Sequence, residues 1–180
     1  MTGAFFLWGK LPAHGDFVAR GLGAERQERI DLWLSAGLAA ARERLGDEFE
    51  PCYDAAPPWR FAYAGEGGWT AGALAASMDS VGRRYPVMVG MDGLTQDEAP
   101  VAAAQSEDAL FQAIGGCWTA DRLVEALPGF PADALLDPVR PEGADWWTLG
   151  DEVAEPFKLA GEQPPALIDR LLQRTAEVRA

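Results

Sequence analysis

Residues 72–91, GALAASMDSVGRRYPVMVGM, contain two short apolar runs separated by a charged insert. The runs, residues 73–76 and 85–91, are too short to cross a membrane as helices and have the length of buried strands. The insert, residues 79–84, holds one acid and two arginines. Because an unpaired buried charge costs several kcal/mol, these charges must lie at the end of a sheet or pair with other groups. The stretch is therefore predicted to form a central hairpin with a polar apex.

The sequence around this hairpin predicts further strands and helices. Residues 25–45 carry apolar side chains at i, i+3, i+4 and i+7, the spacing of one face of an amphipathic helix. Ser106 and Thr119 are predicted to cap two shorter helices, because their hydroxyls can accept free amides at a helix start. We expect strands at residues 4–8, 59–64, 69–76, 84–91 and, as a late edge strand, 145–149; a terminal helix at 165–178; and irregular chain at 51–58, 92–100 and 128–143.

These elements predict an α/β fold. The strands at 59–64, 69–76 and 84–91 are joined by links too short for parallel crossovers, so they should form an antiparallel meander. Helices flank that meander on both sides along the chain, which favours a three-layer α/β/α sandwich around a mostly antiparallel sheet. Strands and helices do not alternate strictly, which argues against a doubly wound parallel sheet. A chain of 180 residues is predicted to form a single domain over residues 1–180.

The negative charge of the chain is concentrated in its second half. Residues 1–84 hold 9 basic and 11 acidic residues, a net charge of −2, whereas residues 85–180 hold 6 and 17, a net charge of −11. This balance argues against nucleic acid or an anionic membrane as a partner, since both are polyanions. It suits a basic protein partner, and solubility is the alternative explanation.

Cysteine usage and the first residues indicate a cytoplasmic protein. The two cysteines, Cys52 and Cys117, form neither a metal-binding pair nor a disulfide framework, so both are expected to be free thiols. The apolar run near the N-terminus is too short for a signal peptide, and no stretch is long enough for membrane insertion.

No motif in the sequence predicts a cofactor or a metal site. Gly9-Lys10 follows a strand but lacks the glycine-rich loop and hydroxyl of a phosphate-binding P-loop. His14 is the only histidine, and with Asp16, Ser77 and Asp79 it forms the one candidate set for a hydrolase or a metal-dependent enzyme. The serine is not in a nucleophile-elbow motif, so a hydrogen-bonded loop is the favoured interpretation.

The charged residues of two loops are predicted to meet at one end of the sheet. The first loop, residues 9–20, leaves a strand, and the second, residues 79–84, joins two strands of the same sheet. We expect Asp16 or Asp79 to pair with Arg83 or Arg84, because pairing would satisfy charges beside apolar runs. These loops are then either a structural clasp or a partner-binding site. For the Trp pair at 146–147, we expect one ring in the core and its neighbour covering the surface.

Four segments resemble the TagF family, also called ImpM. Residues 8–22, WGKLPAHGDFVARGL, resemble that family's opening motif after its first strand, and residues 33–38, WLSAGL, resemble its first helix. Residues 58–61, PWRF, and 72–86, GALAASMDSVGRRYP, resemble two later signatures. The resemblance covers about residues 4–90. The interaction candidates that it places within these motifs are Lys10, His14, Asp16, Arg20, Ser77, Asp79, Arg83 and Arg84.

The resemblance implies an accessory protein of the bacterial type VI secretion system with an α/β sandwich fold. Members of the family are post-translational regulators, generally repressors, linked to a forkhead-associated scaffold protein, and the family is not enzymatic. A scaffold protein is accordingly the expected partner, with neither nucleic acid binding nor membrane insertion.

Overall fold

Seven strands form one sheet in the order β2-β1-β5-β4-β3-β6-β7, and every neighbouring pair is antiparallel. This computed structural model describes residues 3–127, 141–148 and 158–179. The strands are β1 Ala4–Gly9, β2 Val18–Arg20, β3 Trp59–Gly65, β4 Gly68–Ala75, β5 Val87–Leu94, β6 Ala144–Trp147 and β7 Lys158–Ala160. The helices are α1 Ala24–Leu45, α2 Phe49–Asp54, α3 Ala99–Gly115, α4 Ala120–Ala126 and α5 Leu167–Arg179, with the short 3₁₀ turn η1 at Gly46–Glu48.

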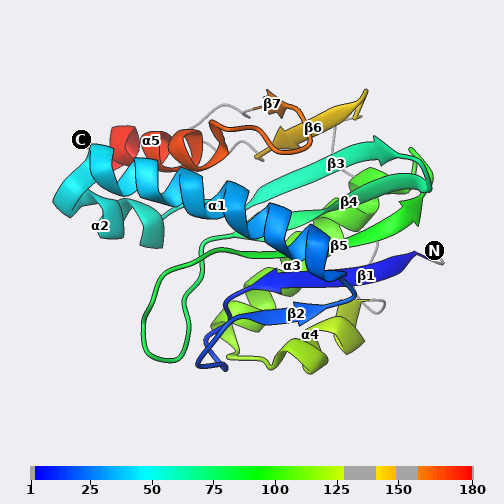
Figure 1. Cartoon of the computed structure of the whole chain (residues 1–180), viewed down its shortest axis with the longest axis horizontal. Coiled ribbons are helices and arrows are strands. Elements are labelled where there is room, and N and C mark those ends of the chain that lie inside the picture. Colours follow the sequence, from blue (N-terminus) through cyan, green and yellow to red (C-terminus); the bar gives the residue numbers. More distant parts are fainter. Residues whose placement is uncertain (1–2, 128–140, 149–157, 180) are drawn as a thin grey trace.

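Helices cover both faces of the sheet, which gives the predicted three layers. Figure 1 shows α1, α2 and α5 in front of the sheet and α3 and α4 behind it. Because successive strand residues point to opposite faces, each strand supplies both cores. In β1, Phe6 packs in the cluster with α1, α2 and α5, and Leu7 in the cluster with α3 and α4. Both side chains are fully buried.

One row of paired residues runs across five strands and explains two glycines in the central hairpin. Phe6 pairs with Gly90, Gly90 with Gly72, Gly72 with Phe61, and Phe61 with Trp146. A Cβ on Gly72 would lie 2.7 Å from Cζ of Phe61, and one on Gly90 would lie 2.8 Å from Cζ of Phe6. The two glycines therefore leave the space that the two phenylalanine rings fill.

Most predicted elements are confirmed, including the central hairpin, since β4 and β5 pair directly. Thr119 caps α4 as predicted, and its side chain accepts the amide of Arg122 at 3.3 Å. Strand β2 was not predicted, and three residues are too few to show a pattern. The segment 128–143 falls largely outside the described residues, at 128–140.

Two helix predictions need correction. Residues 51–58 do not form wholly irregular chain, because α2 extends to Asp54; Pro51 lies in its first turn, where a missing amide costs nothing. Ser106 is not a helix cap: it is buried in the middle of α3, which begins seven residues earlier, at Ala99. Thr95 and Glu98 exchange side chain to amide hydrogen bonds just before that helix, in the manner of a capping box.

The tryptophan pair and its strand also differ from expectation. Trp146 and Trp147 are both buried, with 0% and 1% exposure, and they pack in clusters on opposite faces of the sheet. β6 is not an edge strand, because β7 pairs with its other side. Strand β5 begins at Val87 rather than at residue 84. Pro86 lacks the amide hydrogen that a strand ladder needs, which accounts for the later start.

Replacing Gly72 by alanine should destabilise the fold, because the added methyl meets the main chain of Val89 and the ring of Phe61. We expect a loss of about 1–3 kcal/mol in the free energy of unfolding, the usual cost of overpacking. Urea denaturation measures it, with Gly67→Ala as the control, since a Cβ at Gly67 meets nothing within 4 Å. Equal stability of the two variants would contradict the account of the glycine row.

Candidate functional site

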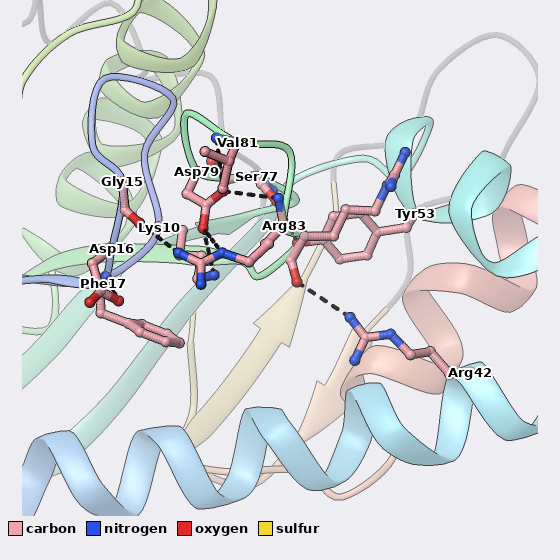
Figure 2. Close-up of polar contacts among 11 residues, drawn as sticks. Lys10, Gly15, Asp16, Phe17, Arg42, Tyr53, Ser77, Asp79, Val81 and Arg83 are labelled. Carbon is pink, nitrogen blue, oxygen red and sulfur yellow. Dashed lines mark hydrogen bonds and ion pairs between the residues drawn. The ribbon is translucent and has the colours of Figure 1, made fainter.

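Asp79 is the centre of the charged residues that join the two motif loops. Its side chain is 0% exposed, yet its Oδ2 atom lies 2.8 Å from Nζ of Lys10 and 2.7 Å from Nε of Arg83. Lys10 lies just after β1 and Arg83 in the turn between β4 and β5. We call Lys10, Asp79 and Arg83 the clasp; Figure 2 shows their side chains converging.

The turn that carries Asp79 is shaped by the same carboxylate. Its Oδ1 atom accepts the amides of Val81 at 3.1 Å and Arg83 at 2.9 Å, so the side chain folds the backbone around itself. Gly82 has a φ of 86°, a left-handed conformation that suits glycine at this point of the turn. Four donors thus surround the carboxylate, two from side chains and two from the main chain.

Main-chain contacts extend the clasp to the first loop. The guanidinium of Arg83 donates to the carbonyl of Gly15 at 2.6 Å, and the amide of Ser80 donates to the carbonyl of His14 at 2.8 Å. The two loops therefore meet at one end of the sheet, as predicted. Of the four pairings that the sequence left open, Asp79 with Arg83 is the one that forms.

The donors around Asp79 also control its protonation. Burial alone would raise the pKa of this carboxyl group, but hydrogen bonds from Lys10 and from the main and side chains of Arg83 lower the pKa well below its usual range. Asp79 is therefore an anion throughout the physiological range, and its negative charge is matched by two cations.

An aromatic group covers the clasp. Phe17 stacks on Trp8 with ring centroids 5.2 Å apart and meets Tyr85 edge-on at 4.7 Å. Nζ of Lys10 lies 5.0 Å from the centroid of the Phe17 ring. These rings shield Lys10 from solvent, which strengthens its attraction to Asp79.

Other candidate residues of the first loop attach it to α4. Nε2 of His14 accepts the amide of Ala120 at the start of that helix, at 3.0 Å. Arg20 donates to Asp121 at 2.7 Å in an exposed ion pair. Asp16 does not join the clasp; its side chain accepts the amide of the next residue, Phe17.

Arg84 and Ser77 face α2 rather than the first loop. Arg84 forms a two-pronged pair with Asp54, at 2.7 and 2.8 Å, and reaches Glu50 at 2.9 Å. The hydroxyl of Tyr53 donates to the carbonyl of Ser77 and accepts its amide, at 3.0 and 3.1 Å. The Ser77 hydroxyl is buried and has no hydrogen-bond partner among the residues that the structure describes. Tyr53 and Asp54 carry no signal in the sequence, since only the fold brings α2 to this turn.

The four residues of the enzyme alternative do not form a catalytic arrangement here. The side chains of His14, Asp16, Ser77 and Asp79 make no hydrogen bonds to one another in the described part of the chain. Within residues 3–127, 141–148 and 158–179, no three acidic, histidine or cysteine side chains cluster as metal ligands. No helix in those ranges has the length and apolar character needed to cross a membrane.

Breaking the clasp should destabilise the protein. Lys10→Met leaves the buried Asp79 carboxylate with one cation fewer, and we expect a loss of about 3 kcal/mol, the low end for a broken buried pair because Arg83 remains. Chemical denaturation measures it, with Arg44→Met as the control for an exposed pair, at about 0–1 kcal/mol. The double variant Lys10→Met/Asp79→Asn should lose less stability than the sum of the losses of the two single variants. Full additivity would refute the coupling.

The clasp should also make stability depend on pH in the acid range. Because the pKa of Asp79 is lower in the folded than in the unfolded protein, its contribution is complete above the unfolded pKa of about 4 and falls as pH drops toward the folded value. The stability gap between wild type and Asp79→Asn should therefore be constant near neutrality and shrink below about pH 4. Urea midpoints measured across that range test this, and a gap independent of pH would contradict it.

Comparison with known proteins supports this fold and identifies the family. The chain is similar to the crystal structure of PA0076 from Pseudomonas aeruginosa PAO1, with a TM-score of 0.70, 25% sequence identity and 93% of each chain covered. No curated protein matches the chain. The family model for the TagF N-terminal domain, type VI secretion system-associated, matches residues 6–128, which include every clasp residue. The chain therefore belongs to the TagF N-terminal domain family of type VI secretion system-associated proteins.

Proposed function

We propose that this protein is a non-enzymatic, cytoplasmic regulator of the type VI secretion system. It represses the system after translation by binding a forkhead-associated scaffold protein or another secretion component. The observation that carries the proposal is the family match over residues 6–128, which associates the chain with type VI secretion. The regulatory role and the scaffold follow from the resemblance to TagF proteins.

The contacts of the motif residues leave none of them arranged for catalysis, which is what the binding proposal requires. Lys10, Asp79 and Arg83 satisfy one another, and Nε2 of His14 accepts a backbone amide. A general base needs a free lone pair within reach of a nucleophile. To act as a base on Ser77, His14 would have to break its hydrogen bond with the amide of Ala120 on α4. The hydrolase alternative therefore requires a rearrangement that the binding proposal does not.

A deletion strain tests the repressor role. In a host whose type VI secretion is measurably repressed, removal of the gene should raise the amount of secreted protein, and the wild-type gene should restore repression. The His14→Ala variant should restore it as well, because this side chain performs no chemistry in the binding proposal and does not line the groove described below. Unchanged secretion after deletion would overturn the regulatory proposal, and failure of that variant, when folded, would favour the enzyme.

Direct binding tests the partner. The purified protein and the forkhead-associated scaffold of the same host should form a complex on size-exclusion chromatography. A complex with a different secretion component would keep the regulatory role and replace the scaffold as the partner. Binding to none of the purified secretion components would remove the proposed mechanism.

A further inference from the structure

Two neighbouring cavities form one groove beside the clasp. The larger has a volume of about 500 Å³ and the smaller about 330 Å³, and they share Ala76 and Ile114 in their linings. Tyr53 at the end of α2 lines the larger cavity, and Phe111 on α3 lines the smaller. The groove thus runs between α2 and the C-terminal part of α3, over the chain that follows β4.

The groove presents apolar surface to solvent. Pro12, Met78 and Ile114 line the larger part, and Pro58, Phe111 and Ile114 line the smaller. Phe111 is 77% exposed and extends this apolar lining to the surface of α3. Together the two cavities could hold apolar side chains of a bound segment, which is how anchor residues bind in protein interfaces.

A buried hydroxyl group in the groove lacks a hydrogen-bond partner. Ser77 is 4% exposed, lines the larger cavity, and its Oγ atom bonds to no described residue. A buried polar group without a partner costs free energy that a ligand could recover by supplying a donor or acceptor. The Ser77 hydroxyl is closed to solvent in this arrangement, so a ligand in the groove would reach it only after the wall of the cavity shifts locally.

The rim of the groove is acidic. Glu50 and Asp54 of α2 have side chains that are 66% and 42% exposed, whereas Arg84, which binds both, is 19% exposed. On α3, Glu107 lies four residues before Phe111, and Asp108 lies three before it and is exposed. Glu107 binds Arg60, a side chain only 7% exposed. Three of these four carboxylates pair with Arg84 or Arg60, and the four together outnumber those two cations, so this part of the surface is negative.

The cation of the clasp does not reverse this sign within the groove. Figure 2 shows the guanidinium of Arg83 directed toward Gly15 and away from Tyr53. The Oδ2 atom of Asp79 lies 2.7 Å from Arg83 and 2.8 Å from Lys10, so the clasp keeps one net positive charge, fewer than the carboxylates of the rim supply in excess. A segment bound over Tyr53 would therefore meet mainly the carboxylates of α2 and α3.

We propose that this groove binds a segment of a partner protein that combines apolar anchor residues with lysine or arginine. The apolar side chains fill the two cavities, and the basic residues pair with the rim. The inference rests on the proposed role as a binding protein and names the surface it uses. The clasp has a part in it, because Asp79 and Ser80 form one wall of the larger cavity.

Selection from a displayed library of random peptides, each of about 12 residues, tests the groove on the 180-residue chain. Enriched peptides are then synthesised, and their affinities are measured by fluorescence anisotropy. Phe111→Ala removes an exposed anchor. Gly115→Phe fills the smaller cavity, since a Cβ at Gly115 meets nothing within 4 Å. Asp108→Lys reverses one rim charge.

Matched controls lie elsewhere on the surface. Leu32→Ala removes a 65% exposed apolar side chain from α1. Gly23→Phe adds a ring where φ is −70° and a Cβ meets nothing within 4 Å. Gly23 precedes α1, whose 22 residues span about 33 Å and separate it from α2.

We expect enriched peptides to contain apolar and basic residues and to bind the three groove variants at least about tenfold more weakly than wild type. The two controls should bind like wild type. Acidic enriched peptides, equal binding to the groove variants, or no enrichment would each overturn the inference. A dimer that Phe111→Ala dissociates would replace the partner segment with a second copy. One of these negative results, together with raised secretion in the deletion strain, would reject the groove as the binding surface and leave the proposed regulatory function intact.

Discussion

A single buried carboxylate holds together the end of the sheet on which the motif loops lie. Asp79 bends its own turn through two amides and binds Lys10 and Arg83 through its other oxygen. The pair of Asp79 with Arg83 does not by itself tie the loops, because both residues belong to the same turn. Lys10 and the Arg83 contact with Gly15 make the link between the loops. The charge balance thus explains why both motifs carry ionic residues beside apolar strands.

The rest of the fold places these loops where they can meet. The pairing of β1 with β5 brings the chain after Gly9 next to Val87, close to the turn that carries Asp79. The row of Gly72 and Gly90 between phenylalanine rings lets the central strands pack closely beneath α1. The clasp in turn supports the wall of the groove formed by Asp79 and Ser80. The binding surface therefore depends on the clasp and on the packing of the central strands, which are mostly buried beneath it.

Local sequence patterns were enough to predict the layers, the central hairpin and the meeting of the two loops. Alternation and helical spacing act over a few residues, so they are visible in a single chain. The pairing of Arg84 with Asp54 was not predictable, because α2 was hidden by Pro51 and its position depends on packing. Ser106 was misread because a serine side chain fits a helix cap and a buried helix interior alike. The groove likewise arises from the packing of α2 and α3, which no local pattern records.

Coupling of the two loops by the Asp79 carboxylate can be observed at single amides. Hydrogen exchange of single amides in the native protein measures this directly, by comparing wild type with Asp79→Asn. The amide of Ser80 bonds to His14, and the amide of His14 bonds to Leu11 within the first loop. The account predicts that both amides lose protection together, whereas the amides of β4 keep theirs. Loss of protection at Ser80 with His14 unchanged would contradict it.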